Sequence, residues 1–234
     1  MLGTALAASA VAVVAAMNLD VGMVVPGTAA AAATVRAEQG AGHGAEHGTA
    51  RAAALPDADG RRAAAGAAAV EACASSLGRA ERALTAAAPA HAAWSRHVGA
   101  VFDVEAGRIS FADSARTWTA VTATTDDDIA GYRTALADYR QVADDCDGLP
   151  LAVGGSGTAQ TCLDRRAGLT AALELASRVV DDWENHVAVL NAFTGDREAY
   201  RAMCRSMVAA GQPDLTAFTR ARDGVAAGPV CSTA

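Results

Sequence analysis

A pattern of rare residues occurs twice in this chain, 89 positions apart. Trp, His and Cys are infrequent here, so agreement of all three at one offset is improbable by chance and indicates an internal repeat. The first copy contains Cys73, Trp94, His97 and Val98, and the second contains Cys162, Trp183, His186 and Val187. The chain should therefore fold as two similar units that pack against each other.

Within each copy, apolar residues recur at alternating steps of four and three. This spacing places them on one face of a helix that packs lengthwise against its neighbours. Each repeat is therefore predicted to begin with a long amphipathic helix, kinked or broken at Pro89 in the first copy and straight in the second. The positions are Ala80, Leu84, Ala87, His91, Trp94, Val98 and Val101 in the first copy, and Leu169, Leu173, Ala176, Val180, Trp183, Val187 and Leu190 in the second.

Shorter helices are expected after each long one. Ser110 with Asp113 has the form of a capping box, and Thr125, which precedes three aspartates, is predicted to cap the next helix. In the second copy Pro213 is predicted to open the last helix. Alanine dominates the apolar residues and only 4% of residues are aromatic. We therefore expect an all-α helical bundle of two pseudo-repeats, at about residues 66–146 and 158–231.

The N-terminal region reads as a targeting segment. Residues 1–33 are apolar and small, which is typical of a signal peptide or an N-terminal anchor, and we favour cleavage because an alanine-rich stretch is marginal as a span. Residues 34–63 have no apolar periodicity and are predicted to form a flexible tether. The two helical repeats would then occupy residues 64–150 and 151–234. This organisation indicates an extracytoplasmic protein, either secreted or anchored to the cell membrane.

The five cysteines all lie beyond residue 70, so an exported chain can form two disulfides with one thiol left over. The economical pairing joins Cys73 to Cys146 and Cys162 to Cys231, because each bond then ties the end of a repeat to its beginning. Pairing of Cys146 with Cys162 across the linker remains an alternative from sequence alone. In either case Cys204 is left over, and we expect it to be buried.

Charge and motifs exclude several function classes. The net charge is −7 and the basic residues, all arginine, form no basic stripe, so nucleic acid is an unexpected partner. The spacing of Gly154, Ser156 and Gly157 does not match a nucleophile elbow, and His43 and His47 lie among glycines that disfavour the helix a metalloprotease needs. These absences favour a protein that is not an enzyme.

The doubled W-x-x-H-V helix, the turn at residues 106–109 and the pair Trp118 and Thr119 resemble an uncharacterised family of actinobacterial secreted proteins and lipoproteins. The resemblance covers roughly residues 70–231. It implies an extracytoplasmic location and a tandem helical repeat, and it implies no chemistry. The family commonly has Met four residues after each His, where this chain has Val101 and Leu190.

His97 and His186 are the candidate metal ligands. Both lie at the edge of the buried stripe and could face each other, so they could bind copper, zinc or haem iron. Alternatively, each could hydrogen-bond to a neighbouring helix and fix its register. Two imidazoles leave a metal under-coordinated unless acids such as Asp182 or Glu105 join them, and the missing Met removes a soft ligand. His91 is expected to be a core or pocket-lining residue.

We therefore expect a non-enzymatic exported helical domain that binds an unknown partner or small ligand at the cell envelope, most simply without a cofactor. The alternative is a metal or haem carrier or sensor that uses the paired histidines His97 and His186. A third possibility is a hydrolase without a recognisable motif. The membrane is expected as a partner only through the N-terminal segment.

Overall fold

The computed structural model of the protein describes residues 58–149 and 157–232. Three predicted features lie wholly or partly outside these ranges: the signal or anchor segment, the tether as far as residue 57, and the glycine-rich linker as far as Ser156. In the described ranges, no helix has both the length and the apolar character needed to cross a membrane.

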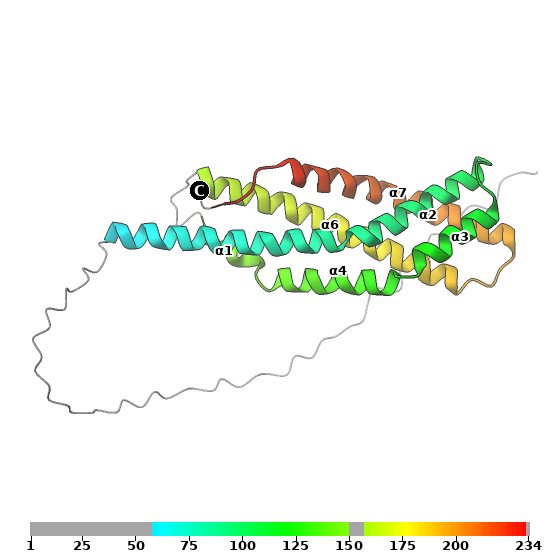
Figure 1. Cartoon of the computed structure of the whole chain (residues 1–234), viewed down its shortest axis with the longest axis horizontal. Coiled ribbons are helices and arrows are strands. Elements are labelled where there is room, and N and C mark those ends of the chain that lie inside the picture. The colour runs from blue at the N-terminus through cyan, green and yellow to red at the C-terminus, as the bar shows by residue number, and fades with distance from the viewer. Residues whose placement is uncertain (1–57, 150–156, 233–234) are drawn as a thin grey trace, which may run out of the picture. The chain divides into compact units, whose positions relative to one another are not determined.

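The described residues form helices and contain no strand, which confirms the all-α bundle (Figure 1). The first repeat contains α1 (Ala58–Ala86), α2 (Ala88–Glu105), α3 (Phe111–Thr122), α4 (Thr125–Arg140) and the 3-10 turn η2 (Ala143–Cys146). The second repeat contains α6 (Gly157–Asn191) and α7 (Arg197–Ala227).

The long first helix of each repeat behaves as its proline content predicts. Pro89 lies in the first turn of α2, where its missing N–H costs no hydrogen bond, and it separates α1 from α2 at Ala87. The break is slight, because the Ala87 N–H still donates to Ala83 and the His91 N–H donates to Ala87. In the second repeat α6 runs unbroken for 35 residues.

Three local predictions need correction. Helix α1 begins at Ala58, so residues 58–63 of the predicted tether are helical, although exposed. Thr125 is not the cap of α4; it is the first helical residue, and its hydroxyl donates back to the carbonyl of Val121. Pro213 does not open a helix, because α7 passes through it unbroken. The capping box of Ser110 and Asp113 at the start of α3 is confirmed.

The α1–α2 pair and α6 lie side by side, parallel and in register. Trp94 meets Trp183 with ring centroids 5.5 Å apart, and His97 meets His186 with ring centroids 4.7 Å apart. Because equivalent residues of the two repeats face each other, the offset of 89 residues is also the register of the central helix pair. Helices α4 and α7 flank this pair (Figure 1).

Each outer helix runs antiparallel to the central pair and contacts the other repeat. From α4, the Tyr132 hydroxyl lies 3.2 Å from the Leu173 carbonyl of α6, and it also lies 2.7 Å from the Ser177 hydroxyl. From α7, the Thr219 hydroxyl lies 3.1 Å from Nε2 of His91 on α2. The two repeats therefore share one core, as in a four-helix bundle.

Two disulfides close the two repeats. Cys73 on α1 is bonded to Cys146 at the end of the first repeat, and Cys162 on α6 is bonded to Cys231 at the end of the second. This is the simpler of the two pairings considered from the sequence, and it leaves Cys204 as a buried free thiol. In the chain-entropy picture, each bond stabilises the fold by about 4 kcal/mol, because it closes a loop of about 70 residues.

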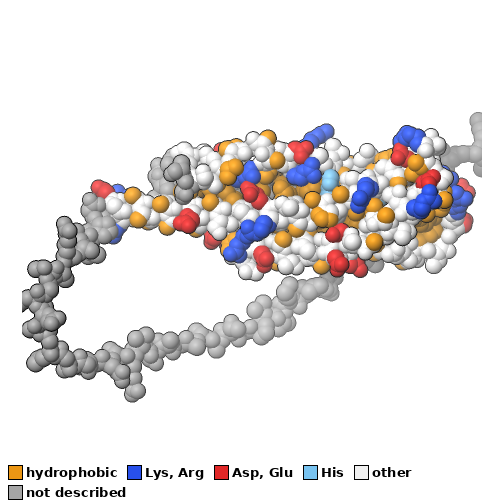
Figure 2. Space-filling model, viewed as in Figure 1, with side chains coloured by type: hydrophobic (Ala, Val, Ile, Leu, Met, Phe, Trp, Pro, Cys, Tyr) orange, Lys and Arg blue, Asp and Glu red, His pale blue; other side chains and the backbone are white. Residues whose placement is uncertain are grey.

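A largely buried arginine joins three helices near the disulfide end. Arg165 of α6 donates from Nη2 to Glu81 of α1 at 2.6 Å, and from Nη1 to the carbonyl of Val225 on α7. Figure 2 shows arginine and acidic side chains interspersed over the visible face of the described bundle.

Candidate functional site

The candidate site is centred on the two repeat histidines. His97 of α2 and His186 of α6 point their Nε2 atoms at each other across 2.9 Å in the bundle interior. The two side chains are almost fully buried, with 3% and 0% of their surfaces exposed. The two histidines therefore face each other between the two repeats, as the sequence predicts.

Both histidines are held neutral. Burial lowers the pKa of His97 to about 4, and burial together with the neighbouring His97 ring lowers the pKa of His186 to about 3. A charged imidazole would lose its hydration here with no buried carboxylate to replace it. At neutral pH the pair therefore shares one hydrogen bond between two uncharged rings.

That single bond fixes the tautomers as a pair. One Nε2 carries a proton and donates, and the other Nε2 accepts, so the accepting ring must carry its proton on Nδ1. Neither Nδ1 atom has a hydrogen-bond partner among the described residues, although both are buried. The pair thus leaves one Nδ1–H donor and one Nδ1 acceptor without a hydrogen bond. Each such buried group lowers the stability of the fold by on the order of 1–3 kcal/mol, so a role in function or a bound water is needed to explain it.

Indole rings enclose the histidines. Trp94 packs against His186 with centroids 4.5 Å apart, and Trp118 of α3 packs edge-on against His97 at 4.9 Å. Trp94 and Trp183 are buried, and their Nε1 atoms are also unpartnered within the described part of the chain. The surroundings of the pair are therefore apolar, which explains why the rings stay neutral.

A pocket opens beside His97 between α2, α3 and α7. Its volume is about 210 Å³, and most of its lining is apolar. His97 and Trp118 form part of the wall together with Val101, Val104, Phe111 and Ala115. A mainly apolar concavity with a few convergent polar groups is the usual form of a small-molecule site.

The opposite wall of the pocket comes from α7. Tyr200, Arg201 and Cys204 lie on it, and Glu105 of α2 faces them. Glu105 lies 3.6 Å from Arg201 and 3.2 Å from Arg205, so its charge is balanced. Burial and the adjacent Cys204 thiol raise the pKa of Tyr200 to about 12, and burial raises the pKa of the Cys204 thiol. Both groups are neutral hydrogen-bonding partners at pH 7.

The predicted additional metal ligands do not join the histidines. Among the described residues, three or more potential ligand atoms gather only at Cys73, Cys162 and Cys231. Glu105 is paired with arginines at the pocket, and the pKa of Asp182 is raised by burial and by the neighbouring Asp214 and Asp181 carboxylates. His91 is half-buried and is neither a core residue nor part of the pocket lining, and its Nε2 atom lies 3.1 Å from the Thr219 hydroxyl.

Sequence reasoning missed the pocket. Tyr200 and Arg201 belong to no recognisable motif, and the sequence marks Cys204 only as a spare buried thiol. Their proximity to His97 depends on the antiparallel packing of α7 against the central pair, and one sequence carries no pairwise signal for that contact. The only available cue was Trp118, an aromatic residue on a short helix without a counterpart in the second repeat.

No family model matches the chain, and no curated protein and no solved structure is significantly similar to it.

Proposed function

We propose that this chain is an exported, non-catalytic helical protein that binds a small apolar molecule in the pocket beside His97. The observation that carries the proposal is the juxtaposition of a mainly apolar pocket with a buried histidine whose Nδ1 lacks a partner. A ligand that fills the pocket gains burial of apolar surface. A single polar group on it can hydrogen-bond to the Tyr200 hydroxyl in the pocket wall, whereas the buried His97 Nδ1 atom is reached only if the imidazole ring turns toward the pocket.

The proposed location rests on the disulfides. Two disulfides within one bundle suggest an oxidising, extracytoplasmic environment. The finer proposal, that the protein is secreted or held at the cell membrane by its N-terminal segment, rests on the apolar character of residues 1–33. The resemblance to actinobacterial secreted proteins and lipoproteins supports the same proposed location.

The pocket limits the size and charge of its ligand. An apolar cavity of about 150 Å³ accommodates benzene, so about 210 Å³ has room for a substituted single ring or a short acyl chain. The pocket lining carries one acidic and one basic side chain, Glu105 and Arg201, Glu105 also pairs with Arg205 outside the lining, and the histidines are uncharged. We therefore favour a neutral ligand over a strong anion or cation.

Thermal unfolding in the presence of small neutral aromatics tests this proposal. We would use toluene, phenol and indole with the full chain, since a ligand that binds only the folded state raises its melting temperature. Ala115→Phe places a ring in the pocket and should abolish the increase. Ala120→Leu, also exposed on α3 but outside the pocket lining, is the matched control and should retain it.

Two results would overturn the proposal. The first is an equal increase in the wild type and in Ala115→Phe, which would place the probe elsewhere. The second is the absence of any increase with all three probes at millimolar concentration. Trp118 adds an independent readout, because its ring lines the pocket and its fluorescence should change on binding only if the pocket is occupied.

A metal site is the second candidate, and one distance favours it. On a tetrahedral ion, two nitrogen ligands that each lie about 2.0–2.1 Å from it are about 3.3 Å apart, so the His97 and His186 Nε2 atoms, now 2.9 Å apart, need to separate by only about 0.4 Å to share one ion. The remaining ligands would have to come from water or from a bound molecule. Native mass spectrometry after exposure to Zn²⁺ or Cu⁺ tests this candidate, with His97→Gln expected to lose the ion and His91→Gln expected to keep it.

A further inference from the structure

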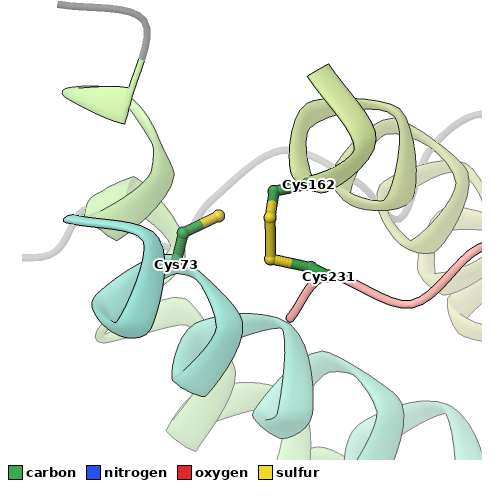
Figure 3. Close-up of side chains that lie close together, drawn as sticks. All are labelled: Cys73, Cys162 and Cys231. Carbon is green, nitrogen blue, oxygen red and sulfur yellow. A yellow bond between two sulfur atoms is a disulfide. The ribbon is translucent and has the colours of Figure 1, made fainter. Parts of the chain in front are cut away.

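The two disulfides meet at one place in the bundle. The Sγ atoms of Cys73, Cys162 and Cys231 all lie within 4.8 Å of one another, and the Cys73 sulfur points toward the Cys162–Cys231 bond (Figure 3). Since Cys146 is bonded to Cys73, all four sulfurs belong to one group, which we term the sulfur cluster.

The repeat geometry brings the cluster together. Cys73 and Cys162 occupy equivalent repeat positions on α1 and α6, which pack side by side in register. Disulfides that only closed two separate repeats would have no need to touch. Here the parallel pairing of the first helices places the buried sulfur of one repeat against the intact disulfide of the other.

We propose that the sulfur cluster is a thiol–disulfide exchange site that reacts with a dithiol. The thiolate of the dithiol attacks Cys231 Sγ, the Cys162–Cys231 bond breaks, and Cys162 leaves as a thiolate. The second thiol of the reagent then attacks the mixed disulfide and releases Cys231 as a thiolate. The dithiol is thereby oxidised to a disulfide and the protein is reduced by two electrons.

The second step is internal and redox-neutral. The Cys162 thiolate attacks Cys73 Sγ, a Cys73–Cys162 bond forms, the Cys73–Cys146 bond breaks, and Cys146 leaves as a thiolate. The product retains one disulfide, now between the two repeats. Reduction at one bond is thus transferred to the other by side-chain movement within contact distance.

Exposure defines where the dithiol enters. Cys231 retains 8% of its surface exposed, whereas Cys73, Cys146 and Cys162 have none. Cys231 also lies beyond the end of α7, outside any helix, and its neighbour Val230 is 68% exposed. Cys231 is still a buried residue, so a dithiol or the active site of a dithiol oxidoreductase would reach the cluster at Cys231 once the C-terminal segment moves aside.

A Cys146→Ser variant tests the internal step without any added reductant. It leaves Cys73 as a free thiol facing the Cys162–Cys231 bond. Exchange predicts that folded chains contain a Cys73–Cys162 or Cys73–Cys231 bond, with loss of the alkylatable thiol at Cys73 and gain of one at Cys231 or Cys162. A variant in which every chain keeps Cys162–Cys231 and an alkylatable Cys73 contradicts the proposal. Circular dichroism reports whether the variant remains helical.

Limited reduction of the wild-type chain tests the proposal even if that variant does not fold. After substoichiometric dithiothreitol, acid quenching and alkylation, cleavage at arginine and aspartate separates Cys146 from Cys162, so the bonds can be mapped. We expect a peptide that joins Cys73 to Cys162 together with an alkylated Cys146. Chains that lose either native bond and form no new one would overturn the proposal. New bonds to Cys204 would also overturn it, because they would show that the disulfides exchange in the unfolded chain.

Discussion

The Nε2 atoms of His97 and His186 lie 2.9 Å apart, although the residues are separated by 89 positions in the chain. This contact follows from the parallel, in-register packing of the first helices of two repeats. It gives the bundle a neutral imidazole pair at its centre, and it places one of the two rings in the wall of a pocket.

Acid should destabilise the protein through this pair. The folded-state pKa values, about 4 for His97 and about 3 for His186, lie below 6.5, so the unfolded chain binds more protons between these values. The stability that the two neutral histidines contribute is therefore fully present above about pH 6.5, and it is lost as the pH falls toward 4 and then 3. The change in pKa from 6.5 to about 4 at His97 alone corresponds to about 3 kcal/mol of the free energy of unfolding. Chemical denaturation from pH 7.5 to 4.5 measures this slope.

The control for the acid effect is the double variant His97→Gln/His186→Gln. It keeps hydrogen-bonding side chains at both positions and removes both titrating groups. Its free energy of unfolding should change less between pH 6.5 and 4.5 than that of the wild type. An identical slope in the two proteins would assign the acid sensitivity to other groups.

A methyl group at Gly211 should disrupt the core. A Cβ atom there would lie 2.8 Å from the Trp94 ring, which is buried and has no space to retreat. We expect Gly211→Ala to lower the free energy of unfolding by about 1–3 kcal/mol. Gly224→Ala, on the same helix, meets nothing within 4 Å and should be neutral or stabilising because alanine favours helices. Equal effects of the two changes would contradict the close packing of α7 on Trp94.

The two disulfides should contribute similarly to stability. They span 73 and 69 residues, and the chain-entropy model assigns each about 4 kcal/mol. The paired variants Cys73→Ser/Cys146→Ser and Cys162→Ser/Cys231→Ser should therefore show comparable decreases in denaturation midpoint. Cys204→Ser, which removes no bond, should decrease it much less. A large difference between the two paired variants would indicate that one bond compensates for a weaker local core.

The helical periodicity predicts the architecture well because it records burial directly. Leu169, Leu173 and Val180 recur at the spacing of one helix face, and all three are buried on α6. The same reasoning locates the break near Pro89, where the proline removes a hydrogen bond that the start of a helix does not need. Recurrence of Trp and His at one offset identifies the residues that meet on the central axis.

Local signals fail where tertiary packing outweighs them. Pro213 costs a helix interior about 3 kcal/mol, yet α7 continues through it because Leu215 and Phe218, which follow it, are buried in the shared core. The first repeat is divided at the equivalent place, between α3 and α4, with no proline there. The pocket was hidden for a related reason, since Cys204 and Trp118 are brought together only by packing between helices.

A nitrogen-15 NMR titration of the histidine rings, with and without a saturating small aromatic that stabilises the protein, would test both the neutral imidazole pair and the pocket beside it. We predict that His97 and His186 are neutral at pH 5 as one Nε2–H and one Nδ1–H tautomer, and that the aromatic shifts the His97 signals more than those of His91. A protonated imidazole at either repeat position at pH 5, or a His97 signal unchanged by a bound probe, would contradict this prediction.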